Sequence, residues 1–200
     1  MSVQGVEISP VGRTRTAPAD NARPQNLRFA FASCQDYQAG FYTAYAHLAE
    51  EDLGFVAFLG DYIYEGAPNP NARRVHEGAG EPLDLAQYRN RHAQYKTDPH
   101  LQAAHAAFPW IVTFDDHEID NNWADEIPQD PQLQTPSQFR ARRIAAFQAY
   151  YEHMPLRAEQ AQIRTAAEFV VENGRPGIAS VTAEPVPLAR TRTAGPIRAS

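Results

Sequence analysis

Side chains that can bind metals follow three short apolar segments of the sequence. Cys34 follows LRFAFAS, Asp61 and Tyr64 follow FVAFL, and Asp116 and His117 follow WIVTF. Carboxylates crowded together repel one another and raise one another's pKa values unless a cation neutralises them. Oxygen ligands suit Ca²⁺, Mg²⁺ or Mn²⁺, whereas a thiolate with a phenolate suits a more charge-dense, softer ion such as ferric iron. The three segments therefore predict a metal site, provided that the fold brings their ends together.

Each feature also has an ordinary structural interpretation. A lone cysteine at the end of a strand is more often a small buried hydrophobe than a ligand. A Gly-Asp pair after a strand is a common turn, and the acids of DDHE favour the positive end of a helix dipole. Three such ends in one sheet are harder to explain as three unrelated turns, so the metal interpretation is favoured.

The hydrophobic pattern predicts the elements that must position these residues. Strand, helix and strand follow one another within residues 27–59, and such a unit implies parallel strands whose carboxyl ends share one edge of the sheet. Cys34 and Asp61 are therefore expected side by side. The predicted strands are about six residues from Leu27, then Phe55 to Leu59 and Trp110 to Phe114; the predicted helices are Tyr42 to Glu51, Leu83 to Tyr95, Pro99 to Ala107, and Ser137 to Tyr151 with Ser137 as N-cap.

The segment 66–82 is rich in Gly, Pro and Asn and is too long for a plain connection. It predicts an excursion loop over the sheet edge or a lid. His76, with Arg73 and Arg74, could lie over a substrate there, but a solvated loop is the favoured interpretation of these three residues.

Composition excludes several classes of protein. The 200 residues carry a net charge of -6, with 43% hydrophobic and 21% charged residues, which argues against a disordered chain and against a nucleic-acid-binding module. The single cysteine excludes a disulfide framework, and no apolar run is long enough for a membrane span. The start of the chain, MSVQGVEISPVGRTRT, lacks a signal pattern, so the chain as written is expected in the cytoplasm.

Several blocks of the sequence, in order, resemble the PhoD-type alkaline phosphatases of the calcineurin-like metallophosphoesterase superfamily. They are FASCQ, HLAEEDLGFVAFLGDYIYEG and YRNRHAQYKTDPHLQAAHAAFPWIVTFDDHEIDNNWA, in which GD and DDHE resemble the GD and GNH[DE] motifs. The resemblance covers residues 27 to about 157 and implies an α/β fold, about half of the usual αββα metallophosphatase sandwich. It makes 1–26 the remnant of a preceding β-domain with a linker and 158–200 an irregular tail.

The resemblance also implies a function and its site. The family hydrolyses phosphate monoesters and diesters by means of a metal-activated hydroxide, with Fe³⁺ and Ca²⁺ as cofactors. Cys34 and Tyr64 are similar to its iron ligands, Asp61 to the bridging carboxylate, Asp116 to a calcium ligand, and His117 to the histidine that contacts phosphate; a structural His117 bonded to Asp120 is the alternative. Residues that could orient these ligands are Asp115, Glu118, Asp120, Asn121 and Asn122.

The family pattern breaks after this region. No Asp follows Asp130 and no His follows His153, so the ligands that the family takes from later strands are missing. The run EFVVENGRPG resembles a stretch near the far C-terminus of such proteins and suggests an internal loss. The family is usually exported through a twin-arginine signal, which this chain also lacks.

Three interpretations follow from this break. The chain is a phosphatase with an incomplete metal site, or a non-catalytic metal-binding or interaction fragment. A third alternative is a product that does not fold stably, because an open half-sheet exposes unpaired strand edges.

Overall fold

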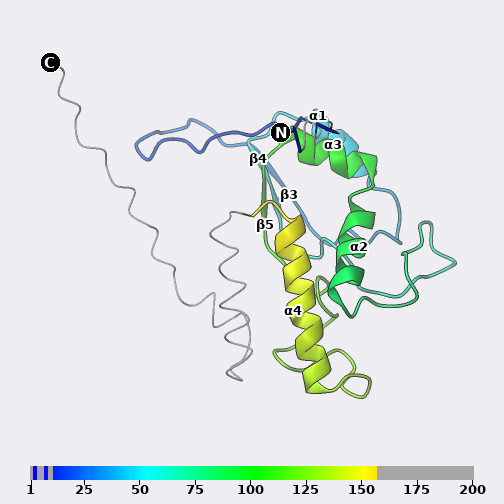
Figure 1. Cartoon of the computed structure of the whole chain (residues 1–200). Coiled ribbons are helices and arrows are strands. Elements are labelled where there is room, and N and C mark those ends of the chain that lie inside the picture. The colour runs from blue at the N-terminus through cyan, green and yellow to red at the C-terminus, as the bar shows by residue number, and fades with distance from the viewer. Residues whose placement is uncertain (1, 4–6, 9–10, 157–200) are drawn as a thin grey trace.

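The computed structural model describes residues 2–3, 7–8 and 11–156, which form an α/β structure (Figure 1). Its strands are β1 (Ser2–Val3), β2 (Glu7–Ile8), β3 (Phe29–Ala32), β4 (Phe55–Phe58) and β5 (Trp110–Val112). Its helices are α1 (Thr43–Glu50), α2 (Leu85–Tyr95), α3 (Pro99–Ala107) and α4 (Pro136–His153). The order of predicted strands and helices from residue 27 onward is confirmed.

A parallel sheet with the order β3-β4-β5 forms the centre of the fold. Phe29 pairs with Phe55, and Ala57 pairs with Ile111. All three strands are shorter than the sequence predicts, because β3 begins only at Phe29 and the chain leaves the ladder just after Phe58 and Val112 in β4 and β5. The parallel pairing itself is confirmed, so the carboxyl ends of the three strands share one edge.

The four helices of the described chain gather to one side of this sheet (Figure 1). Side chains alternate across a strand, so each strand offers one face to the helices and one away from them. Val56, Phe58 and Trp110 are buried in the core with residues from the helices. On the opposite face, Phe31 is 71% exposed and Ile111 is 61% exposed. The sheet is therefore covered on one face only within the described residues.

Polar N-caps begin three of the helices. Asp84 and Asp98 accept backbone hydrogen bonds at the starts of α2 and α3. The prediction of Ser137 as the N-cap of α4 is wrong. Thr135 caps that helix in a capping box with Gln138, and Pro136 occupies the first turn, where its missing N–H costs nothing.

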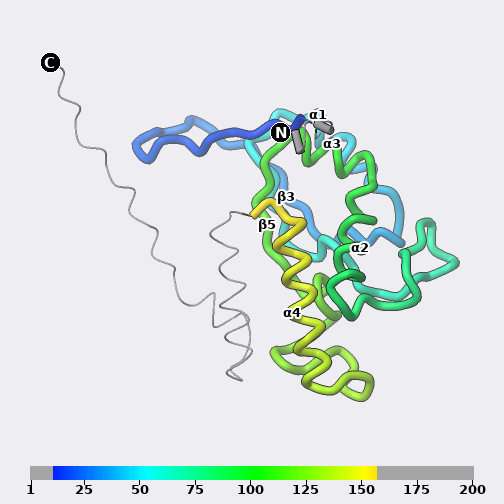
Figure 2. The backbone as a smooth tube through the Cα atoms, viewed as in Figure 1, coloured from blue at the N-terminus to red at the C-terminus, as the bar shows by residue number. Residues whose placement is uncertain are grey.

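The excursion loop 66–82 contains no helix or strand and runs out beside α2 (Figure 2). The favoured interpretation as a solvated loop is wrong for two of its three basic residues. His76 is buried, with its ring nitrogens 2.8 Å from the Gly66 carbonyl and 3.0 Å from the Tyr95 hydroxyl. Arg74 forms a 2.7 Å ion pair with Asp98, whereas Arg73 is exposed. The loop is thus anchored to the body of the protein.

The ends of the chain test few of the predictions. β1 and β2 pair antiparallel, and residues 11–26 contain no helix or strand. The boundaries at residues 26 and 157 stay predictions. The strand-like run EFVVENGRPG and the tail 158–200 lie outside the described residues. Of the helices that are described, none has the length and apolar character needed to cross a bilayer.

Candidate metal centre

The loops that follow β3, β4 and β5 meet at the carboxyl edge of the sheet. The Cys34 N–H donates to the Gly60 carbonyl at 3.1 Å, and the Gln35 N–H donates to the Asp61 carbonyl at 3.2 Å. Gly60 has a φ of +110°, and a Cβ on it would lie 2.6 Å from the backbone nitrogen of Asp115. Only glycine permits this close approach, which brings the loop after β4 against the loop after β5.

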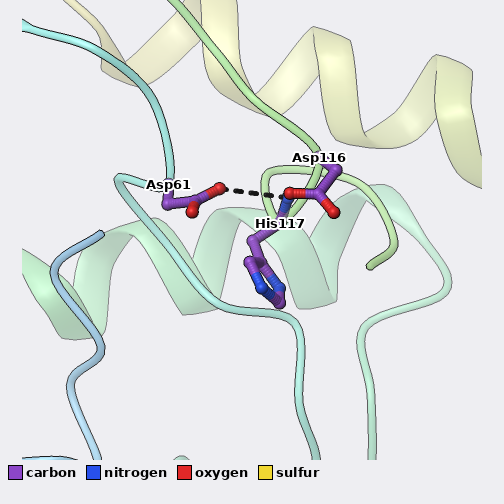
Figure 3. A group of neighbouring side chains, drawn as sticks. All are labelled: Asp61, Asp116 and His117. Carbon is purple, nitrogen blue, oxygen red and sulfur yellow. Dashed lines mark hydrogen bonds between the residues drawn. The ribbon is translucent and has the colours of Figure 1, made fainter. Parts of the chain in front are cut away.

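Asp61, Asp116 and His117 form the centre of the site (Figure 3). One ligand atom from each of the three lies within 4.8 Å of the others. Figure 3 shows the carboxylates of Asp61 and Asp116 extending toward one another, and the His117 N–H donates to Asp61 Oδ1 at 3.4 Å. Burial raises the pKa of Asp61, and the negative charge of Asp116 raises it further. A cation between the carboxylates would relieve this repulsion.

Cys34 and Tyr64 adjoin the same carboxylate. The Tyr64 hydroxyl donates to Asp61 Oδ2 at 3.4 Å. Burial raises the pKa of Tyr64, and the charges of Asp61 and Cys34 raise it further. Cys34 is exposed, and its hydrogen bond to Asp61 lowers the pKa of Asp61. The structure therefore places Cys34 and Tyr64 beside Asp61, and Asp61 beside Asp116, but Cys34 is not in the group whose ligand atoms lie within 4.8 Å of one another. Their metal-binding roles stay predictions.

Sequence reasoning missed Glu65, which holds His117. Glu65 is 3% exposed, and its Oε2 lies 2.8 Å from His117 Nδ1. Burial lowers the pKa of His117, but the hydrogen bond to Glu65 and the charges of Glu65, Asp116 and Asp61 outweigh burial and raise it to about 9. The residue could have been suspected from GDYIYE, where it is the second acid of the motif.

The acids and amides after β5 divide into different roles. Glu118 is buried and accepts hydrogen bonds from the backbone N–H groups of Tyr62 at 2.5 Å and Asp115 at 2.8 Å, so it ties the two loops together. Burial raises its pKa to about 7, although these N–H groups lower it. The Asp115 side chain is exposed. Backbone N–H groups of the two asparagines also stabilise carboxylates of the site: Asn122 donates to Asp116 at 2.5 Å and Asn121 donates to Glu65 at 2.8 Å.

Asp120 does not bond His117, so the partner that the structural alternative names for that histidine is wrong. Asp120 is buried with one oxygen 3.0 Å from Arg142 of α4, and the other oxygen accepts from the Gln129 N–H at 2.9 Å. The contact with Arg142 links the loop after β5 to helix α4. His117 is left to pair with Glu65.

Helix α2 positions the backbone around Tyr64. The Tyr95 hydroxyl accepts from the Tyr64 N–H at 3.0 Å and from the Tyr37 N–H at 3.2 Å, which links the loops after β3 and β4. Arg91 donates to the carbonyls of Tyr64 and Gly66. Both α2 residues are buried. The sequence predicts the helix but not these contacts, because the hydrogen-bond partners lie 25 to 58 residues away.

The donor set fits the cations that the resemblance implies. Carboxylate oxygens from two loops suit Ca²⁺, while a thiol and a phenol beside the same carboxylate suit ferric iron. The candidate iron ligands and the candidate calcium ligands share Asp61, which lies next to Tyr64 on one side and next to Asp116 on the other. A parallel sheet with such donors at its carboxyl edge defines an α/β protein with a candidate metal centre.

Comparison with known proteins gives the family. The family model for PhoD-like phosphatase matches residues 29–174. The chain is 56% identical over 158 residues to alkaline phosphatase D of Bacillus subtilis (strain 168). A solved structure described as "Structure of PhoD" superposes with a TM-score of 0.72 at 55% identity and covers 77% of this chain. The chain belongs to the PhoD-like phosphatase family.

The similarity covers most of this chain but a smaller part of its relatives. The aligned region is 76% of this chain and 27% of the Bacillus protein. It is 30% of the solved PhoD chain. The chain thus spans under a third of the length of each relative and has a partial PhoD fold.

Proposed function

We propose that this chain is a metal-dependent phosphoric ester hydrolase of the alkaline phosphatase D type that acts on phosphate monoesters or diesters. The observation that carries the proposal is the convergence of Asp61, Asp116 and His117 within 4.8 Å at the edge of the sheet. Membership of the PhoD-like family supports the same reaction class. Fe³⁺ and Ca²⁺ are the proposed cofactors.

Asp61, Cys34 and Tyr64 would hold the iron, and Asp61 with Asp116 would hold calcium. When bound, these cations supply Lewis acidity toward phosphoryl oxygens and lower the pKa of water. The backbone of the three loops holds the ligands in place before a metal arrives, because Gly60 and the paired N–H groups fix their spacing. This arrangement is preorganised for cations, because it holds anionic oxygens close together.

His117 would bind the phosphate and face the leaving oxygen. Its raised pKa of about 9 keeps the ring protonated near neutral pH before a cation is bound. A protonated ring can donate a hydrogen bond to an anionic oxygen and neutralise its charge. His117 is therefore proposed as the catalytic residue supplied by this chain.

A non-catalytic metal-binding fragment is the second candidate, and a specific observation favours it. Within the described residues, Asp61, Asp116 and His117 are the one group of three or more acidic, histidine or cysteine side chains whose ligand atoms converge. Two-metal phosphatases commonly need more ligands than this group provides. Turnover separates the two candidates.

Metal analysis and ester hydrolysis test the proposal on the full 200-residue chain. The chain is freed of metal with a chelator, reloaded with Fe³⁺ and Ca²⁺, and assayed with p-nitrophenyl phosphate and bis-p-nitrophenyl phosphate. Bound metal with turnover is the expected result. Bound metal without turnover favours the second candidate, and a chain that binds neither cation contradicts both.

Asp61→Asn is the informative variant for this experiment. It keeps the shape of the side chain but removes the charge proposed to be shared by both cations, so metal content and turnover should both fall by at least about tenfold. Asp52→Asn is the matched control, because the Asp52 side chain is 78% exposed on the surface. The control should retain the metal content and activity of the unmodified chain.

A further inference from the structure

Glu65 is a buried carboxylate whose two oxygens both have partners. Oε2 lies 2.8 Å from His117 Nδ1, and Oε1 accepts from the Asn121 N–H at 2.8 Å. The side chain is 3% exposed. Burial of a carboxylate is costly unless it is paired and hydrogen-bonded, so these contacts are what make Glu65 tolerable at this position. It is not among the converging metal-ligand groups.

Two contacts restrain the His117 ring in different directions. The hydrogen bond to Glu65 fixes rotation within the plane of the ring, because it acts along the Nδ1–H direction. Tyr64 stacks on the face of the ring, with centroids 4.0 Å apart and an interplanar angle of 27°, and limits tilting. The ring orientation is therefore set before any ligand binds.

We propose that Glu65 is a positioning residue that holds Nδ1–H of His117 and leaves Nε2 as the nitrogen that contacts the phosphate ester. This inference deepens the proposed phosphatase function and rests on it for the identity of the ligand. A carboxylate that accepts from one ring nitrogen of a histidine determines which nitrogen is available to the substrate. Glu65 acts through His117 and makes no contact with the substrate itself.

The Asn121 contact gives the carboxylate its own fixed position. Asn121 follows His117 in the same loop after β5, whereas Glu65 belongs to the loop after β4. One carboxylate thus joins the two loops at a side chain and at a backbone N–H. A change at Glu65 is expected to release the ring while Asp61 and Asp116 retain their own contacts with the β5 loop.

Nuclear magnetic resonance of the ¹⁵N-histidine-labelled full chain, free of metal, tests the positioning directly. The unmodified chain should show a slowly exchanging Nδ1–H proton, assigned to His117 by its absence in His117→Gln. Glu65→Ala should lose this resonance. Glu65→Gln, which preserves volume in case the alanine variant does not fold, should shift it upfield because a neutral amide is a weaker acceptor than a carboxylate.

Glu118→Gln is the matched control. Glu118 is as buried as Glu65 and also ties the β4 and β5 loops together, but it bonds Tyr62 and Asp115 instead of the His117 ring. It should retain the Nδ1–H resonance. An unchanged resonance in Glu65→Gln, or equal loss in Glu118→Gln, would overturn the proposal and leave Glu65 with a structural role.

Kinetics on the metal-loaded chain separate this inference from the proposed function. Where the unmodified chain hydrolyses p-nitrophenyl phosphate, Glu65→Gln should lower kcat by about 10- to 100-fold with a smaller change in KM. An unchanged kcat would overturn the claim that Glu65 supports turnover by orienting the His117 ring. A chain that shows the resonance pattern but no turnover contradicts the phosphatase function and supports the positioning of His117 by Glu65.

Discussion

Cys34 and Asp61 lie side by side at the ends of neighbouring strands, and both have a left-handed backbone, with φ values of +56° and +58°. Few non-glycine residues adopt this conformation, because it places Cβ close to the carbonyl oxygen. Such strain persists where the surrounding structure fixes it and is concentrated at functional sites. Two adjacent strained residues that both carry candidate ligands are consistent with selection for the site at the expense of stability.

Replacement of Cys34 by glycine should separate stability from metal binding. Cys34→Gly removes the steric cost of the left-handed backbone and should raise the free energy of unfolding of the metal-free chain by about 1 kcal/mol. The same variant lacks the thiol and should bind less iron. Urea unfolding and iron analysis measure the two effects. Cys34→Ala keeps the strain and is the control, with loss of iron but no gain in stability.

Tyr64→Phe should abolish the colour of the iron-loaded chain. A phenolate bound to ferric iron gives an absorption band in the visible range, and the Tyr64 hydroxyl adjoins Asp61. Absorption spectra of the iron-loaded variant and parent measure the change. Tyr151→Phe, in α4, is the control and should keep the band. A coloured Tyr64→Phe chain would mean that this phenol is not an iron ligand.

Gly60→Ala should destabilise the fold. The alanine Cβ would lie 2.6 Å from both the Cβ and the backbone nitrogen of Asp115, and the φ of +110° is unfavourable for any L-residue. The free energy of unfolding should fall by at least about 2 kcal/mol. Gly40→Ala is the control, because a Cβ there meets no atom within 4 Å. Denaturant unfolding measures both, and equal effects would argue against the close approach of the two loops.

Three histidines buried in neutral form should lower the stability of the protein in mild acid, and they outnumber Glu118, whose raised pKa of about 7 acts in the opposite direction. Burial lowers the pKa of His76 to about 4 and of His105 to about 3, and lowers the pKa of His92 well below 6.5. The unfolded chain binds these protons near pH 6.5, and the folded chain binds them only at lower pH. Stability is thus fully present above pH 6.5 and is lost as the pH falls toward 4, by about 1.4 kcal/mol per pH unit for each proton.

Unfolding of His92→Leu across this pH range tests the effect. His92 has no hydrogen-bond partner for either ring nitrogen among the described residues, so leucine removes one titrating group at little cost in polar contacts. The change of the free energy of unfolding with pH should be smaller in this variant than in the parent, by the amount that one proton contributes. His47→Gln, at an exposed position, should retain the slope of the parent. A slope that His92→Leu leaves unchanged would show that His92 is protonated in the folded chain.

Arg74→Ala should destabilise the protein, whereas the neighbouring Arg73→Ala should not. The Arg74 and Asp98 side chains are 10% and 2% exposed, and removal of the arginine leaves a buried carboxylate without its partner. Loss of one member of a buried ion pair costs about 3 to 5 kcal/mol. Arg74 also stacks on Tyr37, with its guanidinium 3.9 Å from the ring centroid. Thermal and urea unfolding of both variants measure the difference.

The sequence alone determined the order of the elements and the neighbourhood of the candidate ligands. Apolar segments of strand length separated by helical periodicity require parallel strands, and parallel strands place the residues that follow them at one edge. Cys34 and Asp61 could therefore be predicted as neighbours, as the hydrogen bond from Cys34 to Gly60 confirms. The physical reason is that strand direction is a local consequence of chain connectivity.

The tertiary structure alone decided which side chains hold the candidate ligands. Glu65 and Tyr95 gave no distinctive pattern in the sequence, because their partners lie 52 and 31 residues away in His117 and Tyr64. The burial of Arg74 and His76 in a loop rich in Gly and Pro was unexpected for the same reason. Hydrogen bonds between buried groups depend on distances and angles across the packed core, and local composition does not specify them.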